Sequence, residues 1–296
     1  MNDTEALSAW LAAARAERPI LARVPVEGAE IACRAWRTDE ANLPGLILLH
    51  GFQAHAAWWD HLAPALAADG RRVVAFDFSG MGDSDRRTIY KRAIHARELI
   101  AVADAFGMER PAVIGHSYGA IVALAAFGLA PNGFERGILI EPWLNNIAGD
   151  PIEMPLGVKR VFPSLAAARA RFRLLPPEAW AHKDVLDYIM DASFKETEEG
   201  WTWKFDPGAP VQLLDDEPYP PLAHVAIPVD YLYGEHTEVV RLENSLRAHE
   251  ILPTSGRPIA IPAAHHHSMI EQPAALLCAM RALFANPRAP IPPSSK

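Results

Sequence analysis

Short apolar runs recur along the chain and alternate with longer stretches in which apolar and polar residues follow a helical period. The apolar runs predict strands over residues 31–37, 45–50, 72–77, 112–116, 137–141, 229–236 and 258–262. The stretches between them predict helices that include 60–69, 88–106 and 117–130. Strands that alternate with helices indicate an α/β fold, a mostly parallel sheet with helices on both faces.

Three regions depart from this rhythm. Residues 4–17 place Leu7, Trp10, Leu11 and Ala14 at helical spacing, which predicts an amphipathic helix that packs on the body or on a second subunit. Between Glu141 and Val229 the strands stop, and residues 158–162, 164–172 and 184–190 have a helical pattern. The tail is rich in proline, which predicts a flexible end.

This pattern divides the chain into a core that is interrupted once. We expect a first core part at 1–141, an inserted helical cap at 142–225, a second core part at 226–285 and a flexible tail at 286–296. A cap over the site would form a roof that excludes water from the reacting groups.

The strongest candidate for chemistry is the sequence Gly-His-Ser-Tyr-Gly at 115–119, directly after the apolar run 112–114 and before a helical stretch. Strand, sharp turn, serine and helix form the context of a nucleophile elbow. Glycines on both sides leave room for the turn, and the helix N-terminus favours negative charge near Ser117. Ser117 is therefore the predicted nucleophile.

Several further segments resemble the motifs of the α/β-hydrolase family. The segment after strand 258–262 resembles the family ending with a histidine five residues before Glu-Gln-Pro, which here places the histidine at His266. The sequence His-Gly-Phe at 50–52 resembles the family's oxyanion loop, and 77–85 resembles its glycine-rich turn. The resemblance implies an α/β-hydrolase fold with an eight-stranded, mostly parallel sheet and an inserted helical cap.

The same resemblance implies roles for individual residues. His266 would act as the base, and the backbone amides of Phe52 and Tyr118 would form the oxyanion hole. Trp59 stands at the position of a common family tryptophan, and we expect Trp59 and Trp143 to contact the substrate.

The acid of the triad departs from the commonest family pattern. After strand 229–236 the family usually has an aspartate, but this chain has Thr237, which cannot carry the negative charge that steadies an imidazolium. A minority of the family places the acid one strand earlier, where this chain has Glu141. Glu141 is therefore the preferred candidate, and Glu235 and Glu238 stay open as alternatives.

Composition excludes several other classes of function. The 296 residues carry a net charge of −8, from 28 basic and 36 acidic side chains, so a basic footprint for nucleic acid is missing. The two cysteines are too few for a disulfide framework. The N-terminus has no signal-peptide pattern and no stretch is long enough to span a membrane, so we expect a cytoplasmic protein.

Metals and cofactors are not expected. The three consecutive histidines at 265–267 diverge from one loop and lack spaced Cys, Asp or Glu partners for a metal. The turn at 77–85 lacks the motifs of a nucleotide cradle.

These residues favour a serine hydrolase that cleaves a carboxylic ester or lactone through an acyl-enzyme, with a Ser-His-Glu triad. Its expected partner is the small-molecule ester or lactone alone, with a homodimer left open. A carbon–carbon bond hydrolase of the same fold has the same triad and stays open, as does a ligand receptor without activity. Serine at position 117 argues against the dehalogenases and epoxide hydrolases of this family, which use aspartate there.

Overall fold

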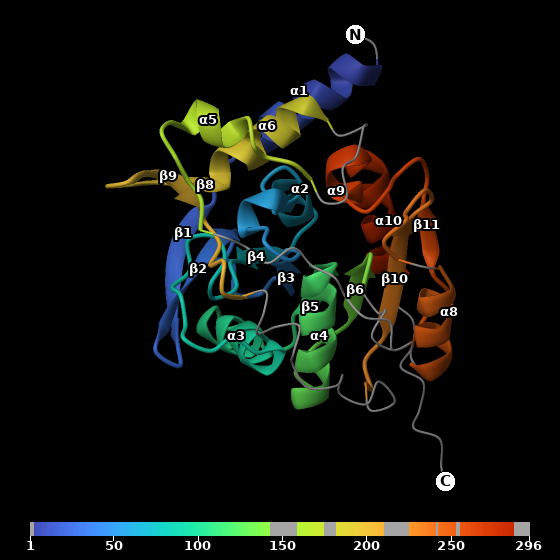
Figure 1. Cartoon of the computed structure of the whole chain (residues 1–296). Coiled ribbons are helices and arrows are strands. Elements are labelled where there is room, and N and C mark those ends of the chain that lie inside the picture. The colour runs from blue at the N-terminus through green and yellow to red at the C-terminus, as the bar shows by residue number, and fades with distance from the viewer. Residues whose placement is uncertain are drawn as a thin grey trace.

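The computed structural model describes residues 3–142, 159–174, 182–209, 225–240, 242–252 and 255–286. A central sheet has the strand order β1-β2-β4-β3-β5-β6-β10-β11 (Figure 1). β1 and β2 are antiparallel, β2 is antiparallel to β4, and the remaining neighbours are parallel. This eight-stranded sheet confirms the predicted fold class. Its strands are β1 (Ile20–Val26), β2 (Ala29–Trp36), β3 (Gly45–Leu49), β4 (Arg72–Phe76), β5 (Ala112–His116), β6 (Gly137–Ile140), β10 (Val229–Gly234) and β11 (Ile259–Ile261).

The middle strands are buried on both faces, which is why they are continuous apolar runs in the sequence. On one face Ile47 and Val113 pack with helices α3 (Arg92–Ala105) and α4 (Tyr118–Leu129). On the other face Leu48 and Ile114 pack with α1 (Asp3–Ala16), α2 (Ala63–Ala68) and α10 (Pro273–Ala285). The described part of the core also contains the 3₁₀ helix η1 (Ala56–Trp59), α8 (Leu242–Ile251) and α9 (Ser268–Glu271).

Two local features differ from the predicted elements. β1 was not expected, because it is an edge strand in which Ile20 and Leu21 are 58% and 70% exposed and so break the apolar pattern. A turn through Glu27 and Gly28, both with positive φ, joins it to β2. The helix expected over 60–69 is shorter, because Pro64 stands in the first turn of α2.

Between β6 and β10 the structure describes, among others, residues 159–174 and 182–209, and we call these two stretches the inserted segment. It contains β7 (Val161–Phe162), α5 (Leu165–Arg169), α6 (Lys183–Ala192), β8 (Phe194–Thr197) and β9 (Gly200–Trp203). The helical prediction for 158–162 was wrong at β7, which pairs with β9 in a three-stranded antiparallel sheet. The reason is long-range, since Val161 and Phe162 are paired across forty residues with Thr202 and Trp201. The domain limits at 142 and 225 stay predictions.

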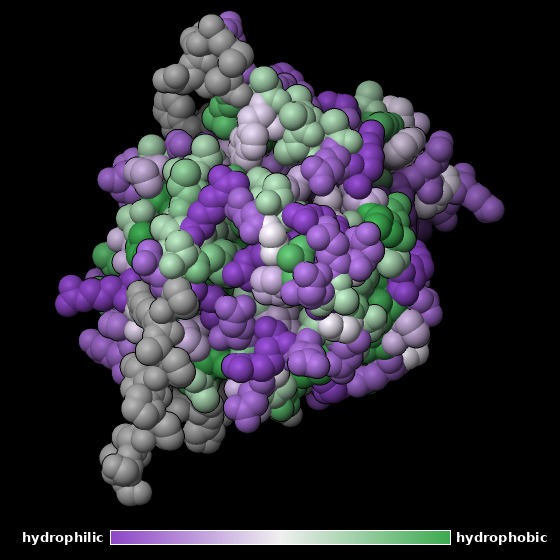
Figure 2. Space-filling view, turned by 180° about the vertical axis from the view of Figure 1, so that it is seen from behind, coloured by the Kyte–Doolittle hydropathy of each residue, from purple (hydrophilic) through white to green (hydrophobic). Residues whose placement is uncertain are grey.

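The surface of the molecule is mixed. Figure 2 shows hydrophilic residues spread over the face opposite to that of Figure 1, with smaller hydrophobic areas between them. Within the described part of the chain, no helix combines the length and apolar character that crossing a bilayer requires. The homodimer and the cytoplasmic location stay predictions.

Candidate active site

Ser117 lies at the sharp turn between β5 and α4. Its backbone has φ 49° and ψ −113°, a left-handed conformation that costs free energy in a residue with a side chain. The Ser117 N–H donates to the carbonyl of Ile140 at the end of β6, with an N···O distance of 2.9 Å. The neighbouring strand therefore helps to hold the strained turn in place.

The two flanking glycines are required by space. A Cβ at Gly115 would lie 2.7 Å from the backbone nitrogen of Ala120, and one at Gly119 would lie 2.6 Å from the carbonyl oxygen of His50. Side chains at these positions would push the turn away from α4 and from β3. The glycines of the pentapeptide thus serve the backbone geometry of Ser117.

His266 connects Ser117 to Glu141. It lies in the loop between β11 and α9, and its Nε2 is 3.2 Å from Ser117 Oγ. Its Nδ1 is 3.0 Å from Glu141 Oε2, and all three residues are buried. With Nδ1–H donated to the carboxylate, Nε2 is left as the acceptor for the serine hydroxyl proton. The structure thus brings the three predicted residues together in one hydrogen-bonded chain.

Glu141 is held through its backbone N–H and through both oxygens of its carboxylate. It follows β6 directly, with φ 51°, and its N–H donates to Leu232 of β10 at 2.8 Å. Its Oε1 accepts from the N–H of Gly234 at 2.6 Å, and its Oε2 accepts from the hydroxyl of Thr237 at 2.7 Å. The side chain is fully buried, and these donors offset the loss of water around its charge.

The two alternative acids lie elsewhere. Glu235 and Glu238 are exposed, and the carboxylate of Glu235 accepts from the N–H of Ala263 at 2.9 Å. In the described structure the carboxylate that contacts His266 is Glu141. This geometry favours Glu141 as the acid.

Other histidines surround His266. His265 Nδ1 lies 2.8 Å from a buried carboxylate oxygen of Glu271, so the His265 ring is paired with a carboxylate other than Glu141. His116 donates from Nε2 to the carbonyl of His266 at 2.9 Å, and burial lowers its pKa well below the usual range. Burial likewise lowers the pKa of His267. Two neutral imidazoles therefore lie beside His266, and the described residues hold no cluster of three or more His, Cys, Asp or Glu suited to a metal ion.

Phe52 and Tyr118, the predicted oxyanion residues, lie on two backbone segments beside the serine. A Cβ at Gly51 would be 2.9 Å from His116 Nδ1 and 3.6 Å from Ser117 Cβ, so this loop runs close to the elbow. The rings of Phe52 and Tyr118 meet edge to face with centroids 5.5 Å apart. Their amides as oxyanion donors remain a proposal.

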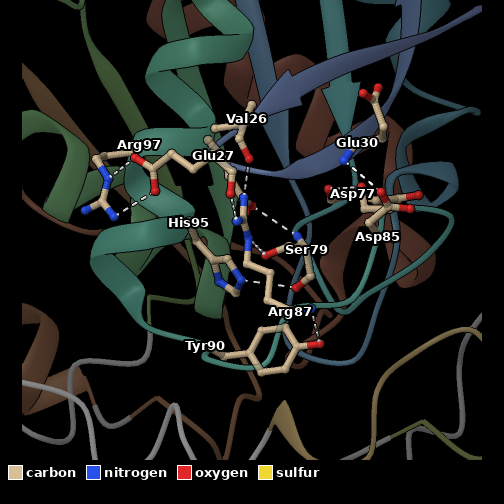
Figure 3. A network of polar contacts seen from close by, with 12 residues as sticks. Val26, Glu27, Glu30, Asp77, Ser79, Asp85, Arg87, Tyr90, His95 and Arg97 are labelled. Carbon is tan, nitrogen blue, oxygen red and sulfur yellow. Dashed lines mark hydrogen bonds and ion pairs between the residues drawn. The ribbon is translucent and has the colours of Figure 1, made fainter.

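A polar network that was not predicted includes His95, Ser79 and Arg87 (Figure 3). The Tyr118 hydroxyl donates to His95 Nδ1 at 2.7 Å, because His95 Nε2 is used to donate to the Ser79 carbonyl at 3.2 Å. Arg87 donates from Nε to the Ser79 hydroxyl and to buried Glu98, both at 3.0 Å. The network ties Tyr118, the residue after Ser117, to the loop after β4. No sequence motif marks it, since its members are joined by contacts between distant segments.

The two tryptophans predicted to contact substrate have different outcomes. Trp59 has no exposed surface and packs in the core on the α2 and α10 side of the sheet. Contact with a substrate would require that the surrounding residues move, and this role stays a prediction. Trp143 lies outside the described residues.

Comparison with known proteins agrees with this geometry. The model of the alpha/beta hydrolase family matches residues 46–279. The chain belongs to the alpha/beta hydrolase family. The match begins in β3 and ends in α10, so it includes Ser117, Glu141 and His266.

Proteins related to this alpha/beta hydrolase are named for different activities. Epoxide hydrolase B of Mycobacterium tuberculosis is 41% identical over 93 residues, which are 30% of this chain and 26% of that protein. The matched part thus spans about a quarter of that relative's length. The human serine hydrolase-like protein is 30% identical over 141 residues, which are 47% of this chain and 68% of that protein.

Solved structures of similar fold cover nearly the whole chain. E-2-(acetamidomethylene)succinate hydrolase has a TM-score of 0.76 at 19% identity, covering 90% of this chain and all of its own (100%). An esterase from Mycobacterium tuberculosis has a TM-score of 0.73 at 20% identity, covering 97% and 99% of the two chains. At such identities these likenesses establish the fold, and the substrate has to be argued from the site.

Proposed function

We propose that this hydrolase cleaves a carboxylic ester or lactone through an acyl-enzyme formed on Ser117. The observation that carries the proposal is the buried chain from Ser117 Oγ to His266 Nε2 and from His266 Nδ1 to Glu141. This arrangement has the parts that a serine nucleophile needs, namely a base within hydrogen-bond reach and a carboxylate that orients the base.

The steps follow from these positions. His266 takes the hydroxyl proton as Ser117 Oγ attacks the carbonyl carbon, and the amides of Phe52 and Tyr118 stabilise the negative oxygen. His266 then gives the proton to the leaving alcohol oxygen, and the acyl group remains on Ser117. Water, deprotonated by His266, attacks the acyl carbon. The bond from this carbon to Ser117 Oγ then breaks, His266 returns its proton to Oγ, and the acid is released. The chain's own groups and water are sufficient for every step.

Serine at position 117 separates this proposal from the activity named for the epoxide hydrolase relatives. Opening an epoxide on an enzyme of this fold forms an alkyl ester on an aspartate at the elbow. A serine hydroxyl would form an ether, which His266 and water could not hydrolyse. The site therefore favours a carbonyl substrate.

The test is labelling with a fluorophosphonate, read by intact mass, followed by turnover of p-nitrophenyl esters from acetate to long acyl chains. Ser117→Ala should abolish labelling and lower kcat by roughly 10³-fold or more, because the nucleophile is lost. Glu141→Gln should still be labelled at Ser117, and its kcat should fall by roughly 10²-fold to 10⁴-fold. Ser8→Ala, in α1, is the matched control and should behave as the wild type.

Ester turnover that persists in Ser117→Ala would contradict the proposal. Labelling without turnover of any ester would favour the carbon–carbon bond hydrolase, which a vinylogous keto-acid substrate would then test. Absence of both would favour a ligand receptor.

A further inference from the structure

Thr237 occupies the position at which most members of the family carry the catalytic acid, yet it takes part in the site. Its hydroxyl lies 2.7 Å from Glu141 Oε2. The same oxygen accepts from His266 Nδ1 at 3.0 Å. The threonine thus touches the one carboxylate oxygen on which the orientation of the histidine depends.

The direction of the Thr237 hydrogen follows from the neighbouring amides. The N–H groups of Val239 and Val240 point to Thr237 Oγ1, at 3.3 and 3.5 Å. Since the amides use the lone pairs of this oxygen, its single hydrogen is left for Glu141 Oε2. The hydroxyl therefore acts as a donor to the carboxylate.

The loop that carries Thr237 is bound on two sides. The N–H of Gly234 donates to Glu141 Oε1, and the N–H of His236 donates to the carbonyl of Ala264 at 2.8 Å. A Cβ at Gly234 would lie 2.1 Å from the carbonyl oxygen of His265. The loop thus contacts both the acid and the histidine loop closely enough to set their relative position.

We propose that Thr237 is a positioning residue for Glu141. Its hydroxyl fixes the Glu141 carboxylate and shares the negative charge of that group, whereas in the commoner family pattern the residue at this position carries the charge itself. This rests on the proposed function, in which Glu141 orients His266. The hydroxyl holds Oε2 in line with His266 Nδ1 and competes with the imidazole for its negative charge. Removing it should leave a carboxylate that is less well aligned with His266 Nδ1 and whose negative charge is shared with one donor fewer.

The experiment compares Thr237→Val, which replaces the hydroxyl by a methyl group of similar size, with Thr237→Ser, which keeps the hydroxyl. Thr237→Val should lower kcat for the best p-nitrophenyl ester about tenfold with little change in KM, the size expected for one charge-assisted hydrogen bond. The acid limb of its pH profile should move to higher pH, because the imidazolium faces a less neutralised carboxylate. Thr237→Ser should restore both.

A double-mutant cycle shows whether the effect passes through the acid. In a Glu141→Gln background, Thr237→Val should lower kcat less than twofold, since the charge that it serves is gone. Equal effects in both backgrounds would overturn the proposal, as would a folded Thr237→Val protein with the wild-type kcat and pH profile.

A readout without turnover separates this proposal from the proposed function. The downfield proton resonance of His266 Nδ1–H should shift in Thr237→Val and return in Thr237→Ser. If the wild type hydrolyses no ester but this shift is seen, the reaction proposal fails and the positioning role holds. An unchanged resonance would overturn the positioning role.

Discussion

The sheet edge around Ser117 and the inserted segment are held by different kinds of contact. At the sheet edge, buried side chains bond to backbone amides of neighbouring strands, as Glu141 does to Gly234. In the inserted segment, many ion pairs lie in water, as in Lys159–Glu199, whose side chains are 59% and 66% exposed. Exposed pairs contribute little to stability, so the inserted segment is stabilised mainly by its buried apolar residues, such as Val185, Ile189 and Phe194.

The inserted segment shares a buried apolar cluster with the core, and polar contacts join the two as well. The Tyr188 hydroxyl of α6 donates to Asp60, whose carboxylate also pairs with Arg34. His55 Nε2 lies 2.9 Å from the hydroxyl of Ser193. The comparison teaches that Ser117, His266 and Glu141 are held by bonds to the sheet and its loops, whereas the inserted segment is held by side-chain contacts with the core.

The strongest test of this difference adds one methyl group to a glycine in each of the two regions. Gly119→Ala should cost several kcal/mol of unfolding free energy and most of the activity, because its Cβ would lie within about 3 Å of backbone atoms of β3 and of the His50 loop. The matched control, Gly208→Ala in the inserted segment, meets nothing closer than 3.4 Å. Chemical denaturation and ester turnover of both variants provide the measurement. Equal losses would mean that the two regions are packed alike.

The second prediction uses pH. Burial lowers the pKa of His61 from 6.5 to about 4, and its Nε2 donates to the carbonyl of Met269 at 2.7 Å. Between pH 6.5 and about 4 the unfolded chain is protonated at His61 but the folded chain is not. The contribution of His61 to the free energy of unfolding is therefore complete above pH 6.5 and is lost as the pH falls to about 4. The loss is roughly 3 kcal/mol.

His61→Gln should remove this slope, so urea denaturation between pH 7 and 4 should show a smaller loss of stability than in the wild type. Asp77 acts with the opposite sign, since burial raises its pKa to about 6. It is present in both proteins and cancels in the difference. Parallel stability curves for the two proteins would refute the assignment of a neutral buried His61.

The smallest effect is expected at the attachment of the inserted segment. Tyr188→Phe removes the hydroxyl that donates to Asp60 while Arg34 still pairs with that carboxylate, so the loss should be about 1–2 kcal/mol. We expect KM to change more than kcat, since the triad is untouched. Lys159→Ala is the exposed control and should stay within about 0.5 kcal/mol. A kcat loss in Tyr188→Phe as large as that of Glu141→Gln would show that the two regions are coupled.

The sequence predicted best what is local or uniformly apolar. β3 and β5 are recognisable because they are buried on both faces, and Ser117 is recognisable because its turn needs glycines at fixed positions. Glu141 could be selected because it ends the strand beside β5, and it lies 3.0 Å from His266 in the structure. The catalytic roles themselves stay proposals.

What the sequence could not supply depends on contacts between distant segments. β7 is a strand only through its pairing with β9, and β1 carries exposed apolar residues that hide its period. The hydroxyl contact of Thr237 and the bond of His95 to Tyr118 join residues that no spacing rule relates. Such contacts can be recognised only after the fold has brought the segments together.

The backbone and carboxylate anchors of Glu141 have a consequence for how such enzymes diversify. The acid stands immediately before Pro142, where the chain leaves the sheet. Bonds to Leu232, Gly234 and Thr237 hold it from the far side of that junction. A recombination event that exchanges only the stretch between Pro142 and β10 would therefore leave in place both the carboxylate that contacts His266 and the residues that hold it.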